Sequence, residues 1–291
     1  MIDAFESNPC ENNHVNCTHS ILTEQIELNE KITHDNNNSE IIVYKDEGII
    51  YKGKDGLAEE YKIDSFIGEG VFGKVYEAQD VNNNEKPVAI KFIRNLPAYS
   101  RQGRKEIVVM KKLMENEESR NSNIVQMIDY FNYKGHVSIV FEKLDVSLLE
   151  LIERTGYTGF PFQEISQITS QIINGLIYAK SKNIIHADIK PENILFVRKN
   201  SMEIRIVDWG SAFFSDEQPQ TYLQSRFYRA PEVLFCHEDS PFSEIDTWSL
   251  GCIISEIYLG LPIFPGNSHY DQALKILNLL GFEIFLNKEP S

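Results

Sequence analysis

The stretch His186-Ala-Asp-Ile-Lys-Pro-Glu-Asn193 is a polar loop with an apolar run on each side, residues 184–185 and 194–196. Loops held at both ends by a buried scaffold often carry binding and catalytic side chains. Asp208-Trp-Gly210 follows a short strand-like segment, and Ala230-Pro-Glu232 comes about twenty residues later. The second half of the chain therefore carries three blocks that suggest a site rather than a core.

A glycine-rich loop lies in the first half, between two strand-like segments. It reads Gly68-Glu-Gly-Val-Phe-Gly-Lys-Val75, with Gly68, Gly70 and Gly73 as its glycines. A glycine loop between strands can lay backbone N–H groups over phosphates, whereas the glycine loop of a Rossmann fold must open a helix. Glycines of an ordinary tight turn explain the same pattern, so the loop alone leaves both interpretations open.

A small residue and a lysine share one face of the next strand. Side chains alternate along a strand, so Ala89 and Lys91 in Val88-Ala-Ile-Lys91 point the same way. We interpret Ala89 as leaving room for a flat base and Lys91 as meeting phosphates. A lysine on an exposed edge strand is the alternative.

The helix that follows offers Lys91 a partner. Glu106 shares a helical face with Val109, Met110 and Leu113, so it points toward the interior. A buried carboxylate needs a partner, and Lys91 is the natural candidate. A glutamate at the rim of the apolar face is the other interpretation.

Strand-like segments dominate the first half of the chain and helices the second, which predicts an α+β protein. The predicted strands are 61–67, 74–78, 88–93, 124–131 and 137–141, with one helix at 101–115; the later helices include 166–182, 246–260 and 269–280. Upstream, the apolar runs 41–44 and 49–51 flank turn-forming residues and predict a hairpin. Residues 1–40 are polar and predict a mostly disordered leader.

Composition argues against several classes of protein. The formal charge of −15 over 291 residues argues against a nucleic-acid binder, which needs a basic stripe, and is easier to reconcile with a basic protein substrate. No apolar run approaches the roughly 20 residues that span a bilayer and no signal peptide is evident, so we expect no membrane contact and a cytoplasmic or nuclear location. Cys10, His14, Cys17 and His19 match no familiar zinc module, which favours a solvated tail over a metal site. The sequence leaves the oligomeric state open.

The glycine loop, Val-Ala-Ile-Lys and the three later blocks together resemble the motif set of the eukaryotic protein kinases, over about 230 residues. Tyr222-Leu-Gln-Ser-Arg-Phe-Tyr-Arg-Ala-Pro-Glu232 is similar to the activation segment of the dual-specificity tyrosine-phosphorylation-regulated kinases, a family that also contains the Yak-type and homeodomain-interacting kinases. Residues 257–266 and 270–272 are similar to the Yak-type branch.

The resemblance implies a bilobal protein kinase fold at 61–291, preceded by an N-terminal extension hairpin at 41–60. The β-rich N-lobe is expected at 61–144 and the α-rich C-lobe at 145–291. It implies the transfer of the γ-phosphate of ATP, with Mg²⁺, to serine or threonine of protein substrates.

The same resemblance implies a role for each matching residue. Asp188 would orient the substrate hydroxyl and Lys190 would neutralise the moving phosphate, while Asn193 and Asp208 would hold Mg²⁺. Phe141 would be the bulky residue beside the pocket, with adenine between Ala89 and Val75 on one side and Leu195 on the other. The implied nucleotide-binding residues are Gly68, Gly70, Gly73, Val75, Ala89, Lys91, Glu106, Glu142, Leu144 and Leu195.

A regulatory switch is also implied. Tyr222 aligns with the tyrosine that this family phosphorylates on itself, and Arg226 and Arg229 could bind the phosphate. A packed tyrosine that is never modified is the alternative, because the family's usual tyrosine two positions earlier is Gln220 here.

The chain departs from the family pattern at three places. Ala187 stands where many kinases carry arginine and this family cysteine, and Trp209 replaces the usual phenylalanine. The sequence stops at Ser291, so we expect a truncated C-lobe in which Glu232 lacks its usual arginine partner and the helix 246–260 is partly uncovered. A kinase-fold scaffold without turnover is therefore the alternative function.

Overall fold

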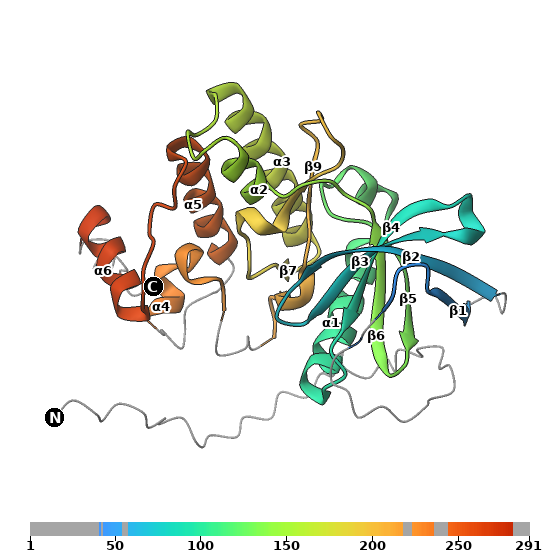
Figure 1. Ribbon diagram of the computed structural model, residues 1–291. Coiled ribbons are helices and arrows are strands. Elements are labelled where there is room, and N and C mark those ends of the chain that lie inside the picture. The colour runs from blue at the N-terminus through green and yellow to red at the C-terminus, as the bar shows by residue number, and fades with distance from the viewer. Residues whose placement is uncertain (1–40, 42, 54–57, 218–222, 236–243, 282–291) are drawn as a thin grey trace, which may run out of the picture.

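The computed structural model describes residues 41, 43–53, 58–217, 223–235 and 244–281. The predicted leader with its four Cys and His residues, Tyr222, and residues 282–291 lie outside the described residues. The described residues form a β-rich lobe followed by a helical lobe (Figure 1), which confirms the predicted order of strands and helices.

Among the described residues, six strands form the antiparallel sheet of the N-lobe, in the order β1-β2-β3-β4-β6-β5. The strands are β1 (Gly48–Lys52), β2 (Ala58–Glu69), β3 (Gly73–Asp80), β4 (Lys86–Ile93), β5 (Met127–Tyr133) and β6 (His136–Glu142). β4 pairs with β3 on one side and with β6 on the other. Lys91 is therefore on an inner strand, which excludes the edge-strand interpretation.

One long helix, α1 (Pro97–Leu113), lies beside this sheet (Figure 1). It begins four residues before the predicted start, at a proline, a residue that favours the first turn of a helix. Its buried face includes Glu106, Met110 and Leu113, as the periodicity of the sequence predicts.

The predicted pairing of 41–44 with 49–51 is wrong. β1 pairs instead with β2, and Ile49 lies opposite Tyr61. Ile49 and Tyr51 of β1 and Tyr61 and Ile63 of β2 are all buried, so this register places the alternating apolar side chains of both strands on one face. The turn before β1 is also bonded to β2, because the backbone N–H of Asp46 donates to the carbonyl of Ile63.

β5 begins at Met127 rather than at the predicted 124. The preceding residues bond to the C-lobe instead: Ile124 forms a bridge with Ile206, and the N–H of Val125 donates to the Ile206 carbonyl. The strand-like sequence 124–131 therefore has two partners: residues 124–125 bond to β9 (Ile204–Ile206) of the C-lobe, and the rest pairs with β6.

The C-lobe is built around α5 (Ile245–Leu259), where Ile253 and Ile257 have no exposed surface. The other helices are α2 (Leu148–Arg154), α3 (Phe162–Ser181), α4 (Pro231–Leu234) and α6 (His269–Leu280). Two short sheets pair β7 (Ile184–Ile185) with β10 (Phe213–Phe214), and β8 (Ile194–Phe196) with β9 (Ile204–Ile206). At the last turn of α5, Tyr258 and Leu259 are exposed. In the described part of the chain, no helix combines the length and apolar character that crossing a membrane requires.

A separate apolar cluster joins β1 to the sheet. Tyr51 is buried and stacks on Phe131 with 4.2 Å between ring centroids, and its hydroxyl donates to Asp129. Ile41 and Val43 are buried in the same cluster. Residues before the predicted kinase domain therefore contribute to the core of the N-lobe.

Tyr51→Ala should lower the free energy of unfolding by about 3 kcal/mol, because it removes a buried ring and leaves a cavity. Equilibrium urea unfolding followed by tryptophan fluorescence measures the change. Tyr44→Ala is the matched control: Tyr44 is 69% exposed, and its loss should cost less than about 0.5 kcal/mol. Equally small effects of both changes would show that β1 does not support the N-lobe core.

Candidate active site

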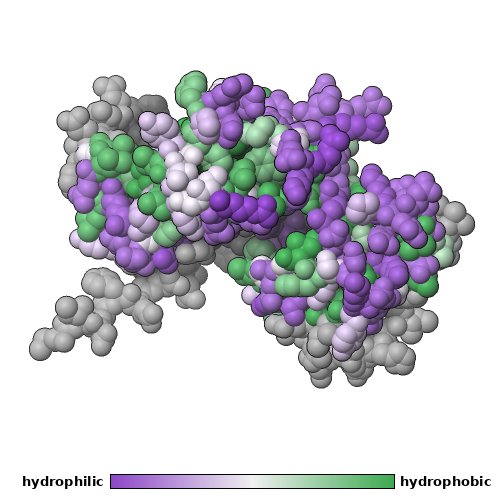
Figure 2. Space-filling model, turned by 45° about the horizontal axis from the view of Figure 1, so that its top comes forward, coloured by the Kyte–Doolittle hydropathy of each residue, from purple (hydrophilic) through white to green (hydrophobic). Residues whose placement is uncertain are grey.

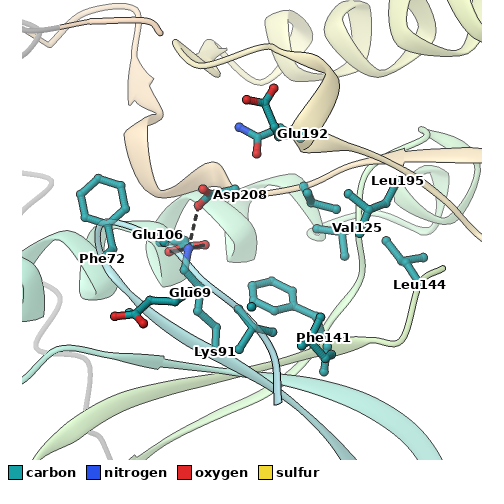
Figure 3. Close-up of a pocket in the computed structure, with 18 of the residues that line it drawn as sticks. Glu69, Phe72, Lys91, Glu106, Val125, Phe141, Leu144, Glu192, Leu195 and Asp208 are labelled. Carbon is teal, nitrogen blue, oxygen red and sulfur yellow. Dashed lines mark hydrogen bonds and ion pairs between the residues drawn. The ribbon is translucent and has the colours of Figure 1, made fainter. Parts of the chain in front are cut away.

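A cavity of about 520 Å³ lies between the two lobes. Figure 2 shows the recess from outside, and Figure 3 shows the side chains that line it. The lining comes from the glycine loop, β4, the end of β6 and residues 188–208 of the C-lobe. It includes all the predicted catalytic, nucleotide-binding and metal-binding residues: Gly68, Gly70, Gly73, Val75, Ala89, Lys91, Glu106, Glu142, Leu144, Asp188, Lys190, Asn193, Leu195 and Asp208. The fold thus brings them together, while their individual roles stay predictions.

One end of the cavity is apolar. Val75 and Ala89 come from the neighbouring strands β3 and β4, and Leu195 approaches from the C-lobe. Phe141 and Val125 also line this end (Figure 3). Two apolar walls from different lobes make a slot that fits a flat ring, although the sequence alone did not indicate Val125.

The three glycines of the loop differ in the space that surrounds them. A Cβ atom at Gly73 would lie 2.0 Å from the carbonyl oxygen of Phe92, so the close approach of β3 to β4 requires glycine there. A Cβ atom at Gly68 or Gly70 would meet nothing within 4 Å, and neither residue has a positive φ. The turn itself therefore does not require these two glycines, whereas a ligand close to the backbone would.

The polar end of the cavity is organised by Lys91. Its Nζ lies 2.8 Å from both carboxylate oxygens of Glu106 and 2.7 Å from Oδ1 of Asp208 (Figure 3). Glu106 is 1% exposed, so the interpretation of a glutamate at the rim of the helix is wrong. The predicted pairing with Lys91 is present.

Burial and charge act against each other in this cluster. Burial raises the pKa of Glu106 despite the nearby Lys91 ammonium. For Asp208, burial acts in the same upward direction, but Lys91 lowers its pKa overall. Burial disfavours the charged form of Lys91, yet the two carboxylates raise the pKa of its ammonium above the ordinary value. Lys91 is therefore held as a cation and Asp208 as an anion at neutral pH.

Asp246 at the start of α5 fixes the beginning of the polar loop. Its two carboxylate oxygens accept from the N–H of His186 at 2.7 Å and of Ala187 at 2.9 Å. Ala187 has φ of 62°, a left-handed conformation that costs energy for a residue with a Cβ atom. Burial raises the pKa of Asp246, although these hydrogen bonds act to lower it. The loop geometry therefore depends on a contact between residues about sixty positions apart.

Three polar side chains of the loop cluster with Ser225. Lys190 Nζ lies 2.8 Å from Oδ2 of Asp188, and the Ser225 hydroxyl donates to Oδ1 of Asp188 at 2.7 Å. The backbone N–H of Ser225 also donates to Oδ1, at 3.0 Å, and Lys190 donates to the Ser225 hydroxyl. Asn193 donates its amide hydrogens to the backbone carbonyl of Asp188 at 2.8 Å. Asp188 is therefore held in one orientation at the mouth of the cavity.

Trp209 fills the space behind Asp208. It is 1% exposed, donates from Nε1 to the carbonyl of Ile206, and packs edge-on against His186 at 4.6 Å between ring centroids. The next residue must be small, because a Cβ atom at Gly210 would lie 3.2 Å from a Glu106 oxygen and 3.3 Å from an Asp208 oxygen. The larger aromatic ring is thus accommodated without displacing Asp208.

The segment 223–230 is anchored to α5 by a buried glutamine. Gln224 donates from its amide nitrogen to the carbonyl of Ile245 and to the hydroxyl of Ser249, both at 2.8 Å, and its oxygen accepts from the N–H of Ala230. Nearby, the Tyr228 hydroxyl donates to Glu256 at 2.7 Å, while burial raises the pKa of Glu256 to about 7. These contacts fix a surface beside Asp188.

The two predicted regulatory arginines have separate environments. Arg229 is 2% exposed and donates from its guanidinium group to the carbonyls of Leu223 and Gln224. Arg226 donates to the carbonyl of Asn267, just before α6. Because Tyr222 lies outside the described residues, its contact with these arginines stays a prediction.

Sequence reasoning missed several residues that shape the site, among them Ser225, Asp246 and Gln224. Ser225 and Gln224 lie inside the segment 222–232 that carries the family resemblance, so the segment was recognised but not these contacts. Asp246 was read only as the first residue of a helix. Its role in the site is evident only from the packing of α5, which brings the Asp246 carboxylate to the backbone N–H groups of His186 and Ala187.

Comparison with known proteins agrees with this geometry. Residues 61–288 match the protein kinase domain family. The chain is 41% identical over 266 residues to the probable serine/threonine-protein kinase yakA of Dictyostelium discoideum, covering 90% of this chain and 18% of that protein. It is 39% identical over 240 residues to dual specificity tyrosine-phosphorylation-regulated kinase 2 of Drosophila melanogaster, covering 82% of this chain and 33% of the relative.

Homeodomain-interacting protein kinase 1 of Caenorhabditis elegans is 40% identical over 226 residues, which are 76% of this chain and 26% of the relative. The chain thus spans between about a fifth and a third of the length of these three relatives. They represent the three branches that the segment 222–232 resembles. The chain therefore belongs to the protein kinase family, in the group of the Yak-type, dual-specificity tyrosine-phosphorylation-regulated and homeodomain-interacting kinases.

Proposed function

We propose that the chain transfers the γ-phosphate of ATP to serine or threonine hydroxyls of protein substrates. One observation carries the proposal: two charge clusters line the same cavity, one around Lys91 and one around Asp188. The first suits phosphates that must be held, and the second suits a hydroxyl that must be oriented. Phosphoryl transfer depends mainly on such positioning and charge stabilisation.

ATP fits the cavity in two respects. The apolar slot between Ala89 and Leu195 suits the adenine ring, and the connector at Glu142–Leu144 can offer backbone hydrogen bonds there. At the other end, Lys91 supplies a permanent positive charge for phosphates, and the open space at Gly68 and Gly70 lets backbone N–H groups approach them.

The residues at the polar end also fit Mg²⁺. Asp208 remains anionic, and the amide nitrogen of Asn193 is engaged with Asp188, which leaves its oxygen for a cation. The described residues hold no cluster of three or more His, Cys, Asp or Glu side chains that could bind a metal by themselves. Mg²⁺ suits such a site, because it is commonly bound by one or two protein oxygens together with phosphates and water. When bound, Mg²⁺ would neutralise charge on the phosphates.

The chain's own side chains then perform the transfer. Asp188 accepts the hydrogen bond of the substrate hydroxyl and receives its proton as the hydroxyl oxygen bonds to the γ-phosphorus. The bond between the γ-phosphorus and the β–γ bridging oxygen breaks in the same transfer, and ADP is the leaving group. Lys190, 2.8 Å from Asp188, stabilises the negative charge of the phosphate in transit. Ser225 keeps the Asp188 carboxylate aligned by two hydrogen bonds.

Protein substrates are proposed because one relative is named a probable serine/threonine-protein kinase and another a dual-specificity kinase. The chain's negative charge favours basic substrates over acidic ones. Its place of action is proposed to be the cytoplasm or nucleus. A scaffold without turnover has no specific support, because all the phosphate-positioning, metal-binding and proton-accepting side chains are present in the cavity.

Lys91→Met should lower the free energy of unfolding by about 3 kcal/mol at pH 8, because it leaves the buried Glu106 without its ammonium partner. Burial already raises the pKa of Glu106, and loss of Lys91 raises it further. A group whose pKa is raised in the folded state contributes less stability as pH rises through that pKa, so the deficit should shrink when the pH falls from 8 to 5.

The matched control is Lys91→Met with Glu106→Leu, which removes both charges and should recover most of the lost stability. Urea unfolding at pH 5 and pH 8 measures all three proteins. A deficit that does not depend on pH and is not repaired in the double variant would contradict the buried pair.

Asp188→Asn should leave ATP binding nearly intact and lower turnover by at least ~10²-fold, because it removes the proton-accepting carboxylate without emptying the adenine slot. A peptide-library phosphorylation assay with Mg²⁺ and ATP measures turnover, and calorimetry measures ATP binding. Near-normal turnover of the variant, in a preparation free of contaminating kinase, would overturn the role of Asp188. A wild-type chain that binds ATP without any turnover would support the scaffold.

We also propose that Tyr222 is phosphorylated by the chain itself and that Arg226 and Arg229 then bind the phosphate. The names of several relatives describe regulation by tyrosine phosphorylation. Mass spectrometry of protein made in a host without kinases should find phosphate on Tyr222 in the wild type and none in Asp188→Asn. An active wild type with unmodified Tyr222 would show that the tyrosine is only a packing residue.

A further inference from the structure

An ion pair outside the cavity ties α1 to the segment that follows Asp208. Lys105 Nζ lies 2.7 Å from Oε2 of Glu217, with the two side chains 24% and 27% exposed. The same oxygen accepts a hydrogen bond from the backbone N–H of Phe214 at 3.3 Å. The carboxylate of Glu217 is therefore fixed to its own segment before it meets α1.

Lys105 belongs to a row of contacts along one face of α1. Gln102, Lys105 and Glu106 are spaced at i, i+3 and i+4, which places them together on the helix surface. Gln102 donates to the backbone carbonyl of Gly210, and Glu106 reaches Asp208 through Lys91. These three side chains thus link the helix to the segment 208–217, Glu106 by way of Lys91, and of the three only Lys105 forms an ion pair with a residue of that segment.

The adjoining buried face of α1 is held by packing on the sheet. Ile107 and Met110 have no exposed surface, and a Cβ atom at Gly103 would lie 2.9 Å from a side-chain atom of Ile93. Apolar packing of this kind is not directional, so it sets the distance between helix and sheet more firmly than the rotation of the helix. Polar contacts at fixed atoms therefore add to the packing in setting the rotation.

Rotation of α1 matters because of Glu106. Its carboxylate is almost completely buried, and it binds Lys91 through both oxygens at 2.8 Å. A buried ion pair is favourable only when its geometry is good, since both charges have lost their water. A small turn of the helix would lengthen these contacts and release Lys91 from its position.

We propose that Lys105 and Glu217 are positioning residues that hold α1 against the segment 208–217 and so keep Glu106 on Lys91. Neither residue lines the cavity, so neither is placed to contact the nucleotide. The effect on rate rests on the proposed phosphoryl transfer. Because Lys105 and Glu217 are charged without any covalent modification, their ion pair can hold α1 in the unmodified protein.

A charge exchange tests the pair. Lys105→Glu and Glu217→Lys each place like charges together, and each should lower kcat by about tenfold, within the range seen for coupled neighbours. The double variant Lys105→Glu with Glu217→Lys restores opposite charges and should recover kcat to within about threefold of the wild type. Each protein is the full chain, and its Tm should stay near that of the wild type.

A second ion pair, at the C-terminal end of the same helix, provides the control. Lys112 Nζ lies 2.9 Å from Glu115, which follows the end of α1, and these side chains are 44% and 55% exposed. Lys112 lies about two helical turns after Lys105. Lys112→Glu, Glu115→Lys and their combination should leave kcat unchanged, because exposed ion pairs contribute little. A loss of rate in this pair equal to that in the first would show that general charge, not the contact with Glu217, causes the effect.

Hydrogen exchange gives a readout that does not need turnover. Amide exchange in residues 97–113 should be faster in Lys105→Glu and should return to the wild-type rate in the exchanged double variant. Unchanged exchange and unchanged kcat in both single variants would overturn the proposal, as would a double variant that recovers neither. An inactive wild type would refute the proposed function alone, and hydrogen exchange would still decide whether the pair holds α1.

Discussion

The contact on which the site depends is that of one ammonium group with two carboxylates. Lys91 is shared between Glu106 and Asp208, so the cluster carries one negative charge in excess. The two carboxylates differ: burial raises the pKa of Glu106, whereas Lys91 lowers the pKa of Asp208. Asp208 has a 37% exposed side chain and faces the cavity, so the excess negative charge is directed to the place where a cation would be needed. The fold thereby separates a buried structural carboxylate from an accessible one.

This contact requires three parts of the chain to be placed independently. β4 is fixed as an inner strand, α1 is fixed by the sheet on one side and by the segment 208–217 on the other, and Asp208 is fixed in a left-handed conformation with φ of 59°. The polar loop depends in the same way on Asp246 of α5, whose burial is tolerated because it satisfies two backbone N–H groups. Two left-handed residues, Ala187 and Asp208, and two buried carboxylates, Glu106 and Asp246, thus shape the cavity, while apolar packing elsewhere supports them.

Sequence patterns predicted the parts of this site whose orientation is set locally. The period of a strand places Ala89 with Lys91, and the period of a helix turns Glu106 inward, so their meeting follows from two short stretches. The contacts of Ser225 and Asp246 depend on how distant helices and loops pack, and no local period encodes that. The error at β1 has a simpler origin: turn-forming residues occur both at 45–48 and at 53–56, and the apolar pattern alone does not decide which of them joins paired strands.

The described residues also indicate which wall of the cavity is fixed. Asn123, which precedes the N-lobe strand β5, donates to the carbonyl of Ile204 and accepts from Asn174 of α3, so this part of the chain is bonded to the C-lobe. The next residues continue these bonds to β9, and Gln126 exchanges hydrogen bonds with Glu142 at the start of the connector. Val125, between them, lines the cavity and must move with the C-lobe. The glycine loop is more open: a Cβ atom at Gly68 or Gly70 would meet nothing within 4 Å, and Val71 is 69% exposed. Opening of the cavity is therefore expected at the glycine loop, while the wall behind the apolar slot stays in place.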